Sequence, residues 1–110
     1  MTAWPTPHAP FTPAPQNKGH FSGYRAHRTP NFNSSRYQNS QKHWMIRRLA
    51  PIDQEIASRI DGMFQMRSEA LLSIDRHVEL FVNALESLNQ LDNTIILYTS
   101  DNGWKLGSID

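Results

Sequence analysis

Residues 94–103 combine an apolar stretch with side chains that could bind a metal ion. The stretch TIILYT is followed by SDNG, which places Asp101 and Asn102 side by side. Ligands of open α/β sheets lie beyond the carboxyl ends of the strands, where this carboxylate and this amide oxygen would stand. Both are hard oxygen donors and the chain has no cysteine, so the pair suits calcium or magnesium rather than zinc. The same three residues Asp-Asn-Gly also form ordinary turns, and calcium needs about six to eight oxygens.

A second candidate is His8, which lies in the proline-rich stretch PHAPFTPAP at residues 7–15. Each proline fixes its own φ angle and drives the preceding residue toward extended geometry, so residues 1–15 are predicted to be extended and stiff. A histidine on a stiff segment has a defined direction and could act as a general acid or donate to a developing anion. A histidine in such an arm can equally be solvated and have no role.

The second half of the chain carries the elements that would position these residues. Apolar residues recur at helical spacing over 52–64, after a helix start at Pro51. A stronger apolar stripe over 71–88 predicts a second helix, with Glu69 among the charged residues on its opposite side. After a turn, residues 94–99 are typical of a strand buried on both faces of a parallel sheet. This order predicts an α/β fold, and a central strand needs neighbours that no other segment convincingly supplies.

The first half is basic and irregular. Residues 1–50 hold seven Lys or Arg and no acid, whereas residues 51–110 hold all ten acids and four bases. Residues 16–41 show neither helix nor strand periodicity and predict a long loop, and residues 42–49 predict either a short helix or a short strand. No stretch has the pattern of a signal peptide or of a membrane span.

Five segments, spread over nearly the whole chain, carry a resemblance to a known family by their residues and by their order: PHAPFTPAP, NFN, KHWMIR, LLSIDRHVELFVNALE and LDNTIILYTSDNGWKLG. Together they resemble the type I sulfatases, most closely the branch of N-acetylglucosamine-6-sulfatases and extracellular heparan-sulfate 6-O-endosulfatases. The resemblance implies an alkaline-phosphatase-like catalytic domain, in which a large mixed sheet lies between helices. It also implies a lysosomal, secreted or cell-surface protein that acts on sulfated glycans.

The resemblance further assigns roles to four residues. The Asp and Asn of the family's SDNG motif bind calcium, so Asp101 and Asn102 take these roles here. The histidine of the family's Pro-His-x-Pro segment reaches the substrate sulfate, and His8 matches it as the catalytic and substrate-binding residue. Lys105 stands where this branch commonly has a histidine and either contacts the anionic substrate or is solvated.

The match is partial. Sulfatases use formylglycine, made from the Cys or Ser of a Cys/Ser-x-Pro-x-Arg motif, and that motif does not occur in this sequence. We therefore expect residues 1–110 to be part of a catalytic domain, with an extended basic segment at 1–50 and helices, central strand and metal-binding loop at 51–110. We also expect the chain to have no sulfatase activity alone, because the rest of the domain is missing.

Two other functions stay open on the sequence. Five aromatic residues lie among the bases of the basic segment: Phe21, Tyr24, Phe32, Tyr37 and Trp44. The segment could therefore bind RNA or a sulfated polysaccharide, although its bases are dispersed and nucleic acid is not the expected partner. A phosphate-ester hydrolase of the same superfamily is the other alternative. Such enzymes usually bind two zinc ions through additional His and Asp ligands, and the asparagine after Asp101 favours a single calcium ion instead.

Overall fold

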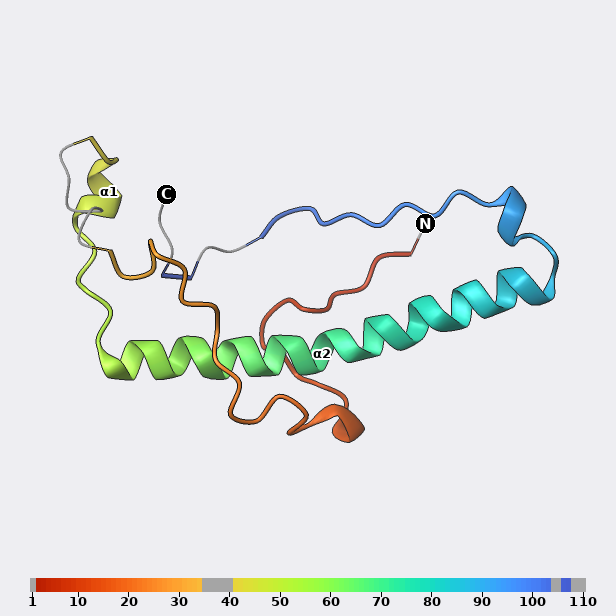
Figure 1. Cartoon of the computed structure of the whole chain (residues 1–110), viewed down its shortest axis with the longest axis horizontal. Helices are drawn as coiled ribbons and strands as arrows, with labels where there is room; N and C mark the ends of the chain where they lie inside the picture. Colours follow the sequence, from red (N-terminus) through yellow and green to blue (C-terminus); the bar gives the residue numbers. More distant parts are fainter. Residues whose placement is uncertain (1, 35–40, 104–105, 108–110) are drawn as a thin grey trace.

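The computed structural model of the chain describes residues 2–34, 41–103 and 106–107. Its helical elements, in chain order, are a 3-10 turn η1 (Pro15–Asn17), a short helix α1 (Trp44–Arg47), a long helix α2 (Gln54–Ser87) and a 3-10 turn η3 (Leu91–Asn93). Figure 1 shows α2 running along the length of the molecule, with the irregular segments on either side of it.

Helix α2 replaces the two separate helices that the sequence predicts. It begins at Asp53, whose Oδ1 accepts a hydrogen bond of 2.8 Å from the Ile56 N–H and so caps the helix. Gly62 lies inside the helix, since one glycine costs only about 1 kcal/mol relative to alanine and cannot by itself break a helix of this length. The two apolar stripes therefore lie on one continuous helix of 34 residues.

The end of α2 is set by a left-handed residue. Asn89 has φ 53°, its N–H donates to the Glu86 carbonyl, and the Gln90 N–H donates to the Leu85 carbonyl. These two hydrogen bonds form a Schellman motif, in which asparagine is one of the few residues that tolerates the left-handed position. The predicted helix exit and turn after Ser87 are thus confirmed.

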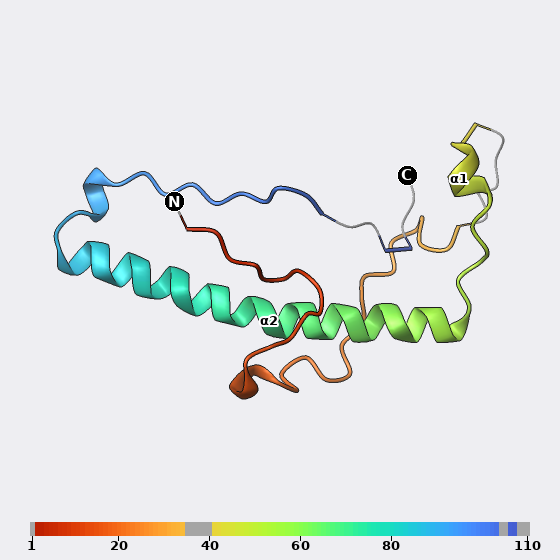
Figure 2. The same cartoon turned by 180° about the vertical axis from the view of Figure 1, so that it is seen from behind.

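The mixed sheet is not confirmed by this structure. No strand occurs in the described residues, and residues 94–99 form a single extended segment that is exposed rather than buried. A strand is stabilised by backbone hydrogen bonds to its neighbours, and an isolated extended segment has none. Figures 1 and 2 show this segment returning along α2 from η3.

The N-terminal third is irregular, as predicted, but residues 5–11 are not extended. The His8 N–H donates to the Pro5 carbonyl at 2.9 Å, and the Phe11 N–H donates to the His8 carbonyl at 3.1 Å, so two turns follow one another. The prolines constrain φ but leave these carbonyls free to accept, and that allows the turns. Residues 42–49, for which the sequence left helix and strand open, contain the short helix α1.

The apolar core is small for a chain of this length. Among the residues that the structure describes, the buried hydrophobic side chains are Phe11, Ile60, Ala70 and Ile74. The radius of gyration is 18.5 Å, whereas a compact domain of this size has about 13 Å. The accessible surface is 8941 Å², whereas a folded monomer of this length exposes about 6,200 Å². Much apolar surface therefore stays open to a partner.

Candidate functional site

The predicted metal ligands lie together at the end of the extended segment. Asp101, Asn102 and Gly103 are all exposed. Asp101 Oδ1 accepts from the Asn102 N–H at 2.8 Å, and the Ser100 hydroxyl donates to the Asn102 carbonyl at 2.6 Å. These bonds shape a local turn and engage one carboxylate oxygen of Asp101. The other carboxylate oxygen and the Asn102 side-chain oxygen make no hydrogen bond to another described residue and are available as ligands.

The structure does not bring His8 to these ligands. His8 is exposed, and its Nδ1–H donates to the Ala9 carbonyl at 2.9 Å, a contact with its own neighbour. No hydrogen bond between described residues joins His8 to Asp101 or Asn102. Nor does any cluster of three or more His, Cys, Asp or Glu side chains suited to a metal occur in the described part of the chain. Lys105 lies outside the described residues.

A buried polar contact attaches the first half of the chain to α2. Asn17 is only 2% exposed, and its Nδ2 donates to the Glu69 carbonyl at 3.2 Å and to the Ser73 hydroxyl at 3.1 Å. Glu69 Oε1 in turn accepts from the backbone N–H groups of Gly19, at 2.8 Å, and Phe21, at 3.4 Å. Glu69, one of the charged residues that the sequence places opposite the apolar stripe, is therefore buried, because its carboxylate provides acceptors for a loop that covers it.

A second contact attaches the part of the chain that follows the SDNG loop. The Asn33 side chain accepts from the Ile52 N–H at 2.7 Å and donates to the Ile52 carbonyl at 2.9 Å, while the Asn33 N–H donates to the Gly107 carbonyl at 2.8 Å. One asparagine thus joins the entry to α2 and the residues beyond the SDNG loop. The segment 94–103 is held at one end by η3 and at the other by this contact. The periodicity of helices and strands in the sequence could not predict this contact of Asn33.

Gly107 is expected to be intolerant of a side chain. Its φ is +80°, and a Cβ there would lie 2.5 Å from Phe32 Cε2 and 2.8 Å from Ile52 Cδ1. Gly107→Ala should lower the free energy of unfolding by roughly 1–3 kcal/mol and deprotect the Asn33 amide, measured by urea unfolding and hydrogen exchange. Gly103→Ala is the matched control, since nothing lies within 4 Å of a Cβ at that position. If the two substitutions lower the free energy of unfolding equally, the close packing of Gly107 against Phe32 and Ile52 does not stabilise the fold.

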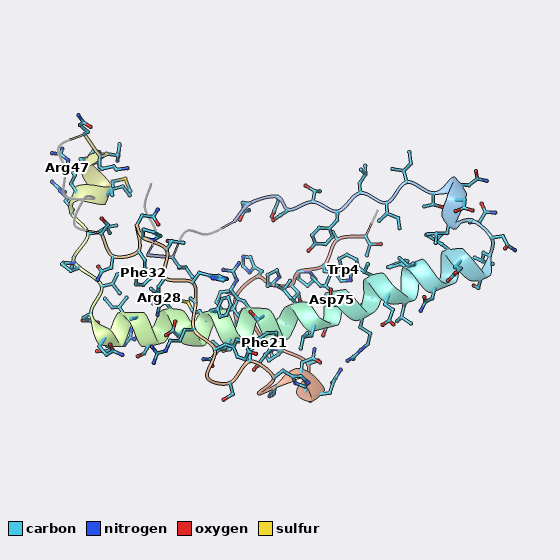
Figure 3. The ribbon with its side chains drawn as sticks, in the orientation of Figure 1. Trp4, Phe21, Arg28, Phe32, Arg47 and Asp75 are labelled. Carbon is cyan, nitrogen blue, oxygen red and sulfur yellow. The ribbon has the colours of Figure 1, made fainter. Side chains whose placement is uncertain are left out.

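A polar cavity of about 430 Å³ lies beside the first half of α2. Arg28 and Asp61 line it and form an ion pair of 2.6 Å, and the Arg28 guanidinium lies 4.4 Å from the centre of the Phe32 ring. Figure 3 shows Arg28 and Phe32 close together above α2. Asp61 already neutralises the charge of Arg28. The ion pair therefore attaches the irregular segment around Arg28 to α2 and does not leave a free positive charge that would attract an anion.

A family model described as Sulfatase matches residues 5–109. This match includes both predicted motifs, the Pro-His-x-Pro segment and SDNG. The chain belongs to the sulfatase family. It is 42% identical over 108 residues to N-acetylglucosamine-6-sulfatase of Homo sapiens, an alignment that covers 97% of this chain and 19% of the relative. It is also 37% identical over 107 residues to the putative extracellular sulfatase Sulf-1 homolog of Caenorhabditis elegans, covering 97% of this chain and 15% of that protein.

This sulfatase-family chain therefore spans about a fifth of the length of the human relative that it matches. A bacterial relative, the N-acetylglucosamine-6-O-sulfatase of Bacteroides thetaiotaomicron, is 49% identical over a shorter stretch of 37 residues, which covers 34% of this chain and 7% of that protein. No solved structure matches the chain. In the described residues, no helix is both long and apolar enough to cross a membrane.

Proposed function

We propose that this sulfatase-family chain contributes to the hydrolysis of 6-O-sulfate esters on glucosamine-containing glycans. The observation that carries the proposal is its 42% identity, over 97% of its length, to N-acetylglucosamine-6-sulfatase. The extracellular sulfatase homologues of Caenorhabditis elegans and Drosophila melanogaster, each 37% identical, support a secreted or cell-surface location, and the family resemblance adds the lysosome as the alternative. The polysaccharide would then be a glycosaminoglycan or a related sulfated glycan.

Asp101 and Asn102 are proposed to supply part of a calcium site. The donor chemistry fits, because a carboxylate oxygen and an amide oxygen on one exposed turn are ligands that calcium prefers. Two donors are too few for a complete calcium site, and the described residues contain no cluster of three or more acidic or histidine side chains that could complete it. The pair therefore fits a site to which other parts of the protein also contribute ligands. When bound, calcium would neutralise negative charge on the sulfate group. The additional oxygen ligands would come from the remainder of a sulfatase domain.

His8 is proposed to bind the substrate sulfate as a hydrogen-bond donor, and Lys105 to contact the same anionic substrate. His8 Nδ1–H already donates to the Ala9 carbonyl, so Nε2 is the atom that would face the sulfate, and it donates there as the imidazolium, in which both ring nitrogens carry a proton. A donor aimed at an oxyanion stabilises the charge that develops on it. The formylglycine nucleophile cannot come from these 110 residues, because its sequence motif does not occur in them.

The extended segment 94–99 is proposed to become a central strand of the alkaline-phosphatase-like sheet. Its exposure in this chain supports that assignment, because all four of its large apolar side chains are open to solvent. Neighbouring strands of a sulfatase domain would pair with its backbone and cover these side chains. Pairing would also fix the position of the SDNG loop at the carboxyl end of the strand, where ligands of α/β sheets lie.

A chimera tests the proposed function. Residues 5–109, the range of the family match, would replace the aligned residues of the human N-acetylglucosamine-6-sulfatase. We expect the chimera to release sulfate from N-acetylglucosamine 6-sulfate, and the isolated 110-residue chain to release none because it lacks the nucleophile. Initial rates of sulfate release, with and without a calcium chelator, measure the activity of the chimera and of the isolated chain. A chimera that melts cooperatively and has no sulfatase activity would refute the proposal, as would turnover by the isolated chain above an Asp101→Ala control.

A further inference from the structure

The backbone on both sides of His8 is held by hydrogen bonds that lie within its own segment. The His8 N–H donates to the Pro5 carbonyl at 2.9 Å, and the Phe11 N–H donates to the His8 carbonyl at 3.1 Å. The ring is tied to the same segment, since its Nδ1–H donates to the Ala9 carbonyl at 2.9 Å. These bonds fix the ring relative to its two turns, but none of them reaches α2. The position of His8 on the fold therefore depends on where this pair of turns is attached.

Phe11 attaches the second turn to α2. Among the residues that the structure describes, it is the buried side chain nearest to His8 along the chain, with 8% of its surface exposed. The Arg67 guanidinium of α2 lies 5.7 Å from the centre of the Phe11 ring, within the range of a cation–π contact. The φ angle of Phe11 is 58°, a left-handed conformation that a bulky residue keeps only where its surroundings hold it. Burial of this ring therefore holds the turn that begins at His8.

Asn17 attaches the same segment to α2 a second time. Its Nδ2 donates to the Glu69 carbonyl at 3.2 Å and to the Ser73 hydroxyl at 3.1 Å, and the residue is 2% exposed. A buried amide is costly without such partners, so its hydrogen bonds favour one arrangement of the chain on the helix. Residues 11–17 are thus held against α2 at both ends.

The path of residues 11–17 determines on which side of α2 the histidine lies. Figures 1 and 2 show the N-terminal segment on one side of α2 and η1 on the opposite side, while the extended segment returns on the same side as the N-terminal segment. Trp4 and residues 94–98 line one apolar groove of about 960 Å³ against α2, and Figure 3 shows Trp4 between α2 and the extended segment. The two attachments therefore place His8 on the side of α2 along which the chain runs to SDNG.

We propose that Phe11 and Asn17 are positioning residues, which hold the turn of His8 on α2 so that its Nε2 faces the sulfate ester. This role rests on the proposed function of His8 as a hydrogen-bond donor to the sulfate. Buried against α2, neither Phe11 nor Asn17 reaches the substrate itself. A donor stabilises an oxyanion only when its distance and direction are held closely, and the exposed turn of His8 has no other buried attachment among the described residues that follow it.

A double-mutant cycle in the active chimera separates positioning from general stability. Asn17→Ala should lower kcat/KM for N-acetylglucosamine 6-sulfate by about 10–100-fold, because a displacement of about 1 Å at a reacting group can cost that much. In a chimera that already carries His8→Ala, the same substitution should cost less than about 2-fold, because the donor that it positions is gone. Equal fold losses in the two backgrounds would overturn the proposal, since a residue that only stabilises the fold acts in both.

Asp61→Ala is the matched control, because Asp61 also attaches an irregular segment to α2. Its Oδ1 accepts from the Ala26 N–H at 3.0 Å and from the Arg28 guanidinium at 2.6 Å. This substitution should change kcat/KM by less than about 2-fold in either background. Phe11→Leu, which keeps an apolar side chain in place, provides a second cycle and should show the same dependence on His8. A loss in Asp61→Ala as large as that in the test variant would also contradict the proposal.

Hydrogen exchange in the isolated chain tests the attachment without sulfatase activity. Relative to the Ile74 amide inside α2, the Phe11 amide should exchange about 10-fold faster in Asn17→Ala than in the wild-type chain. Asp61→Ala should leave this ratio unchanged. An unchanged ratio in Asn17→Ala would overturn the proposal whether or not the chimera is active. An inactive chimera would refute the proposed function alone, because the exchange rates still decide whether Phe11 and Asn17 hold the turn at His8.

Discussion

Replacing Asp101 by alanine in the active chimera is expected to lower kcat/KM for N-acetylglucosamine 6-sulfate by about 10²–10³-fold. The physical reason is the loss of the charged oxygen ligand that this chain is proposed to contribute to the shared calcium site. Excess calcium should restore part of the activity, because weaker binding can be offset by mass action. Initial rates across a calcium titration measure both effects.

Two further variants separate the metal role from a structural one. Asp101→Asn keeps an oxygen ligand and the acceptor for the Asn102 N–H but removes the charge, so its loss of activity should lie between wild type and Asp101→Ala. Asp92→Ala removes an acid from η3 at the other end of the extended segment and should leave activity unchanged. If Asp92→Ala and Asp101→Ala lose activity equally, or if calcium does not shift the Asp101→Ala rates, the ligand assignment is wrong.

Glu69→Ala is expected to have the largest effect on stability, lowering the free energy of unfolding by roughly 2–3 kcal/mol. The Glu69 carboxylate accepts from the Gly19 and Phe21 N–H groups, and its removal leaves both partly buried donors without their acceptor. The loss should appear in urea unfolding and as faster hydrogen exchange at the Gly19 and Phe21 amides.

The control for this stability change is Glu79→Ala, at an exposed glutamate on the same helix. It should change the free energy of unfolding by less than about 0.5 kcal/mol, as surface substitutions away from specific contacts usually do. If the hydrogen exchange of the Gly19 amide is unchanged in Glu69→Ala, the Glu69 carboxylate does not hold the loop around Gly19, whatever the change in global stability.

Local signals in the sequence predicted the helical parts of this fold well. The apolar stripe over 71–88 and the turn after Ser87 depend on neighbours within one or two helical turns, and both occur in the structure. The fusion of the two predicted helices was missed because Gly62 weakens a helix without ending it. The four-residue helix α1 was undecided, since a segment that short depends on its cap, which His43 provides by accepting from the Met45 N–H.

The candidate site shows the limit of local reasoning most clearly. Asp101 and Asn102 are neighbours in sequence, so their shared turn could be predicted from the motif. His8 lies more than ninety residues away from them in the chain. No hydrogen bond or ion pair among the described residues joins the two motifs, and these residues contain no strand that would align them. Their joint role remains a proposal based on family membership.

The sequence by itself determined the family, the amphipathic helix, the apolar segment and the hard oxygen donors at its end, because each depends on residue types at short spacing. Only the tertiary structure decided that Glu69 is buried, that Asn33 joins Ile52 to the chain beyond SDNG, and that residues 94–99 stand open over an apolar groove. The reason is that hydrogen bonds and burial between distant segments depend on which surfaces the chain can cover. This chain folds its first half onto α2 and has no second strand, among the residues described, to cover TIILYT.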